Sequence, residues 1–271
     1  MRCGLLDDIQ EFLNFMVQSL YKYCIFDLED QRSEKQLSTP MLWFSSPESL
    51  NDPFECKPKF TFEGTAKEEV KLLVDYLRRT SQTKGLIDLL QEALAIQQGG
   101  YFSKMKEQFE KDILKKIEKE IGICCLSERN NSILMWSHYA KDHTGYCVEF
   151  EASETTPFFG AAQKVEYDHS YPMVDFFNTP HEKQVDLIFL TKYICWKYEA
   201  EWRICDYVSG PGLREYPAEL MRSVTFGVRM LREHREQIKN WLSRRGHPVA
   251  FYQAFCDADQ FKIIMKPADF C

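Results

Sequence analysis

The chain has 271 residues, of which 44% are hydrophobic and 28% are charged. This is the composition of an ordinary globular protein, and it excludes a collagen-like chain, a coiled-coil rod, a disordered tail and a small disulfide scaffold. The net charge of −7 argues against a general attraction to nucleic acid or to anionic lipid. The ten cysteines lie scattered, mostly in apolar runs and without a CxxC pair, so we expect reduced thiols in the core.

The longest apolar runs, such as residues 123–126 and 187–190, fall far short of the roughly 20 residues that cross a bilayer. Asp7, Asp8 and Glu11 interrupt the apolar pattern at the N-terminus and argue against a signal peptide. We therefore expect a cytoplasmic protein without a membrane partner.

The first 44 residues predict one helix and two strands. Apolar spacing is typical of a helix over residues 5–20, and an aromatic-rich strand follows over 20–26. A polar stretch at 27–39 separates this strand from a second, short strand at 41–44.

Residues 66–120 differ from the rest of the chain because helical periodicity dominates there. Gly85 and the pair Gly99-Gly100 divide the segment as helix stops. We interpret it as two or three helices that form an insertion or lid within a single domain spanning residues 1–271.

The strand pattern returns at residues 121–127. Ser132 is suited to cap a helix over 133–142, and Gly145 is suited to end that helix in a left-handed conformation. Clean alternation at 146–151 predicts the next strand.

The remaining pattern alternates between short strands and helices. Strands are predicted at 163–168, 196–208, 223–230, 249–255 and 260–265, and helices at 182–193 and 232–244. Since the strands look mostly antiparallel and intermix with helices, the sequence predicts an α+β fold with a mixed, mainly antiparallel β core and a helical insertion.

The first candidate site lies in the predicted strand over residues 196–208. Side chains alternate between the two faces of a strand, so Lys197, Glu199, Glu201 and Arg203 share one face. Two carboxylates at this spacing lie about 7 Å apart, and flanking cations can keep both ionised. Such a pair can hold a sugar hydroxyl and stabilise positive charge at an anomeric carbon. The alternative is a solvated strand face with self-compensating charges.

The second candidate site is the segment 127–145, where Trp136, His138, Tyr139 and His143 crowd a short helix and its exit. The two histidines are five residues apart, which is not the spacing of two metal ligands on one helix face, so we predict no metal site. Active-site roles and loop-orienting hydrogen bonds both remain open for these histidines.

The third candidate site is the segment 44–54, in which Ser45, Ser46, Asn51 and Asp52 can present hydroxyl, amide, carboxylate and backbone groups to a polar ligand. The same residues can simply build the turn. The sequence contains no P-loop, no GxGxxG and no GxSxG motif.

Taken together, these stretches resemble the bacterial domain-of-unknown-function 2971 family. The resemblance rests on five segments in the family's order: Leu20-Tyr-Lys-Tyr, Trp43-Phe-Ser-Ser-Pro, Asn51-Asp-Pro-Phe, Leu134-Met-Trp-Ser-His-Tyr-Ala with His143 and Gly145, and Tyr198-Glu-Ala-Glu-Trp-Arg203. It spans residues 20–265 without the insertion at 66–120. The family commonly has Arg after Lys-Tyr, where this chain has Cys24.

Tyr21-Lys-Tyr23, Phe44-Ser-Ser46 and Glu199-Ala-Glu201 occur in this order along the chain. In this they resemble, more distantly, ADP-ribosyltransferases, which carry a polar residue on a first strand, a serine or aromatic residue on a second and Glu-x-Glu on a later strand. The resemblance implies an NAD-consuming enzyme, in a toxin or an anti-phage defence effector. It implies that Glu201 holds the nicotinamide ribose and that Glu199 positions or activates an acceptor, with NAD as the substrate. Ser45 or Ser46 would support the ribose. The remaining implied binding residues are Tyr21, Lys22, Tyr23, Asn51, Asp52, Trp136, Tyr139, His143 and Arg203, and His138 is a further catalytic candidate.

Two other classes of function remain open. Glu199, Glu201, His138, Asp142 and Glu149 could supply metal ligands for a nuclease or phosphodiesterase, with the basic stretch 222–246 holding nucleic acid. A high aromatic content of 14% also fits a non-enzymatic ligand-binding module. We expect a small nucleotide as the main partner, with a protein or nucleic acid as the acceptor of a transferase.

Overall fold

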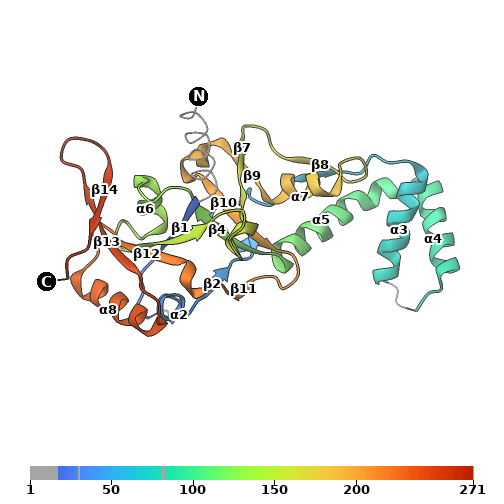
Figure 1. Ribbon diagram of the computed structural model, residues 1–271. Helices are drawn as coiled ribbons and strands as arrows, with labels where there is room; N and C mark the ends of the chain where they lie inside the picture. The colour runs from blue at the N-terminus through green and yellow to red at the C-terminus, as the bar shows by residue number, and fades with distance from the viewer. Residues whose placement is uncertain (1–17, 30, 81–82, 271) are drawn as a thin grey trace, which may run out of the picture.

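The computed structural model describes residues 18–29, 31–80 and 83–270, so most of the helix predicted over 5–20 lies outside the described residues. Its centre is an eight-stranded sheet in the order β14-β13-β12-β5-β1-β4-β10-β6 (Figure 1). These strands are β1 (Gln18–Cys24), β4 (Gly122–Ser127), β5 (Tyr146–Ala152), β6 (Gln163–Lys164), β10 (Glu201–Asp206), β12 (Met221–Phe226), β13 (Ala250–Cys256) and β14 (Ile263–Pro267). Only β12 and β13 pair in parallel within this described sheet, which confirms the α+β class with a mainly antiparallel core.

Three small sheets and seven α-helices accompany the central sheet in the described part of the chain. The small sheets pair β2 (Met41–Phe44) with β11 (Gly212–Glu215), β3 (Lys59–Thr61) with β8 (Met173–Asp175), and β7 (Glu166–Asp168) with β9 (Thr191–Tyr193). The described α-helices are α2 (Gln31–Ser38), α3 (Ala66–Thr80), α4 (Leu86–Gln98), α5 (Phe102–Glu120), α6 (Ile133–Tyr139), α7 (His181–Phe189) and α8 (Arg232–Leu242). The 3₁₀ helices are η1 (Pro47–Ser49), η2 (Phe159–Ala161), η3 (Ile194–Glu199), η4 (Ala218–Leu220) and η5 (Ser243–Arg245).

One face of the central sheet, which we call the α8 face, is apolar. Tyr146, Val148 and Phe150 alternate along β5 and are fully buried there, as the sequence pattern predicts. They belong to one hydrophobic cluster with Leu37 of α2 and Trp241 of α8, and those two helices contact each other. Burial of apolar area on this side is the main source of the sheet's stability.

The opposite face, which we call the α6 face, carries a row of polar residues in addition to apolar residues of two further hydrophobic clusters. Cross-strand pairing places Tyr21 beside Ser127 and Ser127 beside Glu201, so their side chains lie in one row across three strands. Helix α6 covers part of this face with the fully buried Trp136, whose ring meets that of Tyr23 edge-on at 5.2 Å between centroids. The two faces of the same strands therefore have different chemistry.

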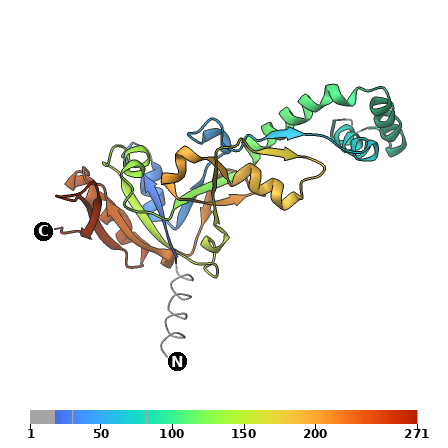
Figure 2. The same ribbon diagram turned by 90° about the horizontal axis from the view of Figure 1, so that it is seen from above.

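The predicted insertion consists of three helices. Figures 1 and 2 show α3 and α4 at the end of an arm that extends away from the central sheet, with α5 leading back into β4. Leu73 and Leu77 of α3 are buried in one cluster with Leu89 and Ala93 of α4. The same cluster continues through α5 to Ile123 of β4, so the packing of the arm is continuous with that of the central sheet. No helix among residues 18–29, 31–80 and 83–270 has the length and apolar character that a membrane span requires.

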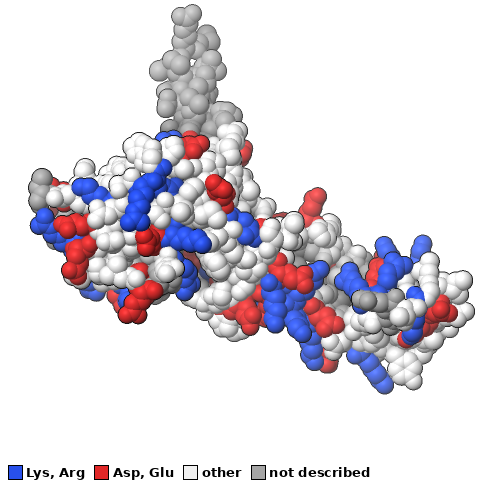
Figure 3. All heavy atoms as spheres, turned by 90° about the horizontal axis from the view of Figure 1, so that it is seen from below, with Lys and Arg blue, Asp and Glu red and all other residues white. Residues whose placement is uncertain are grey.

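The basic stretch 222–246 does not form a separate charged surface. Three of its arginines form ion pairs with carboxylates: Arg222 with Glu151, Arg232 with Glu236, and Arg244 with Glu34. On the face of the molecule shown in Figure 3, basic and acidic side chains are interspersed. The stretch is therefore compensated in part within the chain.

Several predicted elements need correction. The polar stretch 27–39 contains α2, which the sequence did not reveal because only Ser33 and Leu37 of that helix are buried. The helix predicted over 182–193 ends at Phe189, and residues 191–193 form β9. The described residues 18–20 belong to β1 rather than to the predicted N-terminal helix.

The exit of α6 also differs from the prediction. Ser132 caps α6 by accepting a hydrogen bond from the Met135 N–H at 3.4 Å, as expected. The left-handed residues that follow are 141–143, however, and Gly145 is not one of them. Glycine is required at 145 because a Cβ there would lie 2.2 Å from the carbonyl oxygen of Cys24.

In the described part of the chain all eight cysteines are free. The predicted location in the core holds for Cys24, Cys56, Cys124 and Cys147, whereas Cys195 and Cys256 are exposed.

Candidate active site

The central sheet opens between β1 and β4, where Tyr21 and Ser127 form the one residue pair found between these strands in the described chain. Further along β4, Ser45 takes the place of β1. Its N–H donates to the Ile123 carbonyl at 2.9 Å, and the Ile123 N–H donates back at 2.8 Å. A cavity of about 230 Å³ lies at this opening, and we call it the acidic cavity.

Residues from both faces of the sheet line the acidic cavity, which shows that it reaches into the gap between β1 and β4. Its lining includes Tyr21, Lys22, Tyr23, Ser45, Asn51, Glu55, Cys125, Leu126, Tyr139, Lys192, Glu199 and Glu201. Eight of the residues that the sequence singled out therefore lie on one cavity.

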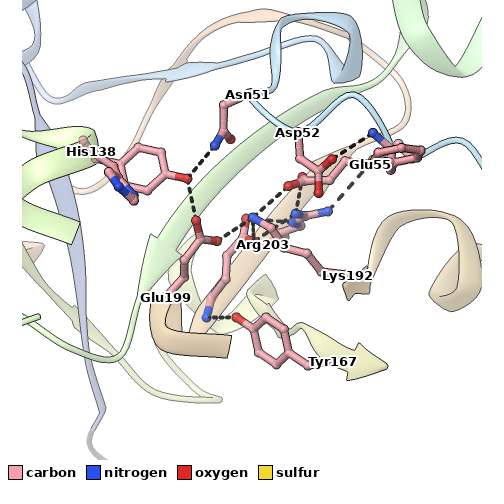
Figure 4. A network of polar contacts seen from close by, with 12 residues as sticks. Asn51, Asp52, Glu55, His138, Tyr167, Lys192, Glu199 and Arg203 are labelled. Atoms are coloured by element: carbon pink, nitrogen blue, oxygen red, sulfur yellow. Dashed lines mark hydrogen bonds and ion pairs between the residues drawn. The ribbon is translucent and has the colours of Figure 1, made fainter. Parts of the chain in front are cut away.

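Three carboxylates surround one ammonium group in this cavity (Figure 4). Lys192 Nζ lies 2.7 Å from Glu55 Oε1, 2.5 Å from Glu199 Oε2 and 3.0 Å from Glu201 Oε2. All four side chains are buried, so bulk water screens these charges only weakly. The alternative of a solvated strand face is therefore wrong for Glu199 and Glu201.

Arg203 forms the second cation of the network and is completely buried. Its Nε and one terminal nitrogen donate to the two carboxylate oxygens of Glu201, at 2.8 and 2.9 Å. The same terminal nitrogen donates to Glu55 Oε2 at 2.6 Å, and the other donates to the Phe189 carbonyl at 2.8 Å. This two-point contact fixes the plane of the Glu201 carboxylate.

The network separates the acidities of the two glutamates. Burial alone would raise the pKa of Glu201, but Arg203 and Lys192 lower it to about 2. Burial raises the pKa of Glu199, since Lys192 offsets only part of that effect and the nearby charge of Glu201 adds to it. Glu201 is therefore firmly ionised, whereas Glu199 has the higher proton affinity.

Helix α6 reaches the cavity through Tyr139. The Tyr139 hydroxyl donates to Glu199 Oε1 at 2.5 Å and accepts from the Asn51 side-chain amide at 3.0 Å. Burial, followed by the charge of Glu199, raises the pKa of Tyr139, so the phenol keeps its proton and remains a donor.

His138 lies outside this arrangement. It is exposed, does not line the acidic cavity, and its Nδ1 lies 2.9 Å from the hydroxyl of Tyr198. The structure thus links the α6 segment to the glutamates through Tyr139 rather than through the catalytic candidate His138.

Lys22 is the cation at the gap itself. Its side chain starts on the α8 face of β1, and its ammonium donates to the Cys125 carbonyl at 3.1 Å. Because β1 and β4 have separated here, this carbonyl faces the gap, and the ammonium takes the place of a strand partner. Within the described chain this is the one hydrogen bond found for the Lys22 ammonium, which leaves donors directed at the cavity.

The backbone between the two glutamates is not the continuous strand that the sequence predicted. Glu199 ends the 3₁₀ helix η3, Ala200 is left-handed with φ 44° and ψ 55°, and β10 begins only at Glu201. The prediction that Lys197, Glu199, Glu201 and Arg203 share one face of a continuous strand is therefore wrong, since only Glu201 and Arg203 belong to β10. The bend at Ala200 directs both carboxylates to Lys192, at a conformational cost of about 1–2 kcal/mol for a residue with a Cβ.

Four other predicted residues lie away from the acidic cavity. The side chain of Trp136, a residue of α6, is fully buried, and its Nε1 donates to the Asn130 carbonyl. Because it is buried, the ring is not available to stack on a ligand. His143 stacks on Trp136 and contacts the Ser137 hydroxyl. Ser46 and Asp52 instead build the turn before β3: the Ser46 carbonyl accepts from Ser49, and the Asp52 carboxylate accepts from the Phe54 N–H.

Three residues of the polar network around Glu199 and Glu201 were not predicted from the sequence, namely Glu55, Lys192 and Tyr167. The Glu201 N–H donates to the Tyr167 hydroxyl at 2.8 Å, which fixes the start of β10. Lys192 carried a usable signal, because a lysine two residues after the apolar run 187–190 needs a partner if it is buried with that run. Glu55 carried a weaker signal, being the residue that follows the Asn51-Asp-Pro-Phe turn.

The fold and the cavity together define an α+β protein with a buried glutamate pair at an opening in its central sheet. Residues 135–204 match the model of a family described as "Protein of unknown function (DUF2971)". This confirms the expected resemblance to the domain-of-unknown-function 2971 family for that part of the chain. The matched segment includes Tyr139, Lys192, Glu199 and Glu201. No curated protein and no solved structure matches the chain.

Proposed function

We propose that the acidic cavity cleaves the N-glycosidic bond of NAD, as an ADP-ribosyltransferase or an NAD glycohydrolase. The observation that carries this proposal is the pair Glu199–Glu201, buried at one ammonium but with opposite shifts in pKa. Two carboxylates with separated proton affinities are suited to divide an electrostatic role and an acid–base role between them.

In this proposal Glu201 stabilises the charge that develops on the sugar. The bond between ribose C1′ and the nicotinamide nitrogen breaks, and its electron pair leaves with nicotinamide. C1′ then carries positive charge, which an ionised carboxylate in a poorly solvated cavity stabilises. Arg203 is a positioning residue here, because its two hydrogen bonds fix the plane of the Glu201 carboxylate.

Glu199 activates the acceptor in the same scheme. An acceptor oxygen or nitrogen, or a water molecule in a glycohydrolase, bonds to C1′ while its proton passes to Glu199. The raised pKa of Glu199 favours this transfer, and Tyr139 orients the carboxylate through its short hydrogen bond.

The size and charge of the cavity support this assignment. A volume of about 230 Å³ lies below the roughly 300–1,000 Å³ of sites that enclose a drug-sized ligand, and it suits a single sugar. The rest of the dinucleotide would lie outside, with the ammonium of Lys22 at the gap as a contact for a phosphate oxygen.

The test is nicotinamide release from NAD by the purified full-length protein. We expect Glu201→Gln to reduce the rate about 10²–10³-fold, the loss typical of one stabilising group in an enclosed site. Glu149→Gln is the matched control. That carboxylate lies on the same sheet face, accepting from Ser19 and Ser223, but does not line the acidic cavity.

The outcomes separate the remaining hypotheses. Release that is equally fast in wild type and Glu201→Gln would contradict the proposal. NAD binding by calorimetry without any release would favour the non-enzymatic binding module instead.

The metal-dependent alternative has less support. No group of three or more His, Cys, Asp or Glu side chains suited to a metal ion occurs in the described part of the chain. The ammonium of Lys192 already lies among the three carboxylates that would otherwise be the natural ligands.

A further inference from the structure

A second cavity adjoins the acidic cavity and shares Glu55 and Lys192 with it. Its volume is about 500 Å³, and we call it the aromatic cavity. Its walls carry the rings of Phe54, Tyr171, Tyr193 and Trp196, together with the carboxylates of Asp52 and Glu55. The proposed NAD chemistry does not use this cavity.

The rings of the aromatic cavity are unusually open to solvent for large apolar groups. Phe54 is 66% exposed, Tyr171 49% and Tyr193 53%. They come from three separate segments, the turn before β3, the segment between β7 and β8, and β9, so the fold gathers them at one place. Exposed rings gathered at a concave surface indicate a binding site rather than scattered surface residues.

The ring geometry favours a compact ligand over a flat one. Phe54 and Tyr171 meet at 85° with centroids 6.4 Å apart, and the second ring pair, His169 with Tyr193, meets at 81° and 6.3 Å. A flat base would be sandwiched best between parallel rings. Perpendicular rings form a corner, whose faces and edges surround a roughly spherical group.

The charge of the cavity favours a positively charged ligand. Asp52 contributes a carboxylate, and Lys192, the only lysine or arginine among the described lining residues, is already paired with Glu55, Glu199 and Glu201. Lys192 Nζ also lies 5.0 Å from the ring centroid of Trp196, a cation–π contact at the floor of the cavity. The site thus already stabilises one cation against its aromatic wall.

We propose that the aromatic cavity binds an organic cation of the alkylammonium class, held by the faces of Phe54, Tyr171 and Tyr193 and by the charge of Asp52. The proposal is independent of NAD cleavage, since it uses none of the groups placed at the ribose. Cation–π attraction to several rings is the physical basis of recognition for quaternary ammonium groups.

The test compares two ligands of nearly equal shape, choline and 3,3-dimethylbutan-1-ol, of which only choline is charged. Both are titrated into the full-length protein and followed by ligand-observed NMR and by calorimetry. We expect choline to bind at least about tenfold more tightly than the neutral alcohol, because only the cation is attracted to the rings and to Asp52.

Variants locate the binding. Phe54→Ala and Tyr171→Ala are each expected to weaken choline binding several-fold, whereas Tyr171→Phe keeps the ring and should retain it. Asp52→Asn should weaken choline but not the neutral alcohol, since the amide oxygen can still accept from the Phe54 N–H. Phe261→Ala removes a fully exposed ring outside the aromatic cavity and is the control.

Equal affinity for the two ligands would overturn the proposal, because it would define a merely apolar pocket. Absence of choline binding at tens of millimolar, or binding that survives both Phe54→Ala and Tyr171→Ala in folded protein, would also overturn it.

Discussion

The two faces of the central sheet are built from the same strands but are stabilised in different ways. On the α8 face, Val148, Phe150 and Val224 are fully buried among other apolar side chains. On the α6 face, Glu201 and Arg203 of β10 are buried just as deeply, but among charges. The first face gains stability from every buried methyl group, whereas the second depends on a balance of large opposing electrostatic terms.

The proposed function assigns separate tasks to the two faces. A buried ion network contributes little net stability compared with apolar residues of the same volume. We therefore propose that the network on the α6 face is retained for chemistry, whereas the α8 face supports the fold. The following experiments challenge or refine that contrast, starting with the largest expected effect.

The largest loss in the free energy of unfolding is expected from truncating one buried side chain on each face. Phe150→Ala should lower the free energy of unfolding by about 3–5 kcal/mol, through lost burial and the cavity left behind. Arg203→Met should cost a similar amount, because it leaves Glu201 and Glu55 buried without their partner. Urea unfolding measures both.

A double variant distinguishes the two mechanisms. Glu201→Gln should recover part of the loss caused by Arg203→Met, because it removes an uncompensated charge, but should recover none of the loss caused by Phe150→Ala. A cost below about 1 kcal/mol for Arg203→Met would contradict the claim that the network is electrostatically balanced.

The free energy of unfolding should depend on pH mainly through the buried glutamates of the α6 face. The pKa of Glu201 is about 2 in the folded protein against an ordinary value of 4.5, so its contribution is complete above about pH 4.5 and is lost as the pH falls toward 2. A shift of this size corresponds to on the order of 3 kcal/mol. Glu199 opposes this trend, because its raised pKa favours folding at low pH.

Unfolding curves between pH 6 and pH 3 test this expectation. Glu201→Gln should flatten the fall in stability with acid, and Phe150→Ala should shift the whole curve without changing its shape. An unchanged slope in Glu201→Gln would show that the carboxylate does not have a lowered pKa.

A smaller effect is expected from the tyrosine that α6 contributes. Tyr139→Phe removes the donor to Glu199 and should cost about 1–2 kcal/mol, as for a hydrogen bond to a charged group. It should also raise the pKa of Glu199 further and move the acid limb of NAD turnover to higher pH. Tyr216→Phe, which loses a buried hydroxyl that accepts from Arg245 on the other side of the sheet, should leave that limb in place.

The smallest effect is expected at the bend between the glutamates. Ala200→Gly relieves a left-handed alanine but adds freedom to the unfolded chain, so the free energy of unfolding should change by less than about 1 kcal/mol. Ala254→Gly, at an ordinary buried strand position, should be clearly destabilising. Equal losses in both variants would contradict the left-handed conformation of Ala200.

Much of the fold follows from local pattern. Alternation along β5 and helical periodicity over residues 66–120 reveal elements whose burial has one simple period. Helix α2 was missed for the opposite reason, since a mostly exposed helix has little apolar periodicity. The segment 196–200 was misassigned because its residue types suit a strand, whereas tertiary contacts of Glu199 hold it in a 3₁₀ helix and a left-handed turn.

The candidate site could be predicted only in part. Spacing identified Glu199 and Glu201, and order along the chain brought in Tyr21, Ser45 and Asn51. Glu55 lies more than 130 residues from Lys192 in sequence, and no local rule pairs residues at that separation. His138 is a residue type typical of catalysis and Trp136 one typical of ring stacking, yet Tyr139 is the residue of these three that lines the cavity.

The connection between the arm and the central sheet bears on the opening between β1 and β4. Helix α5 runs from the arm into β4 with only Ile121 between them (Figure 2). The arm is therefore attached to one of the two strands that border the opening. Chain continuity through β4 thus joins the arm directly to the lining of the acidic cavity, to which β4 contributes Ile123, Cys125 and Leu126.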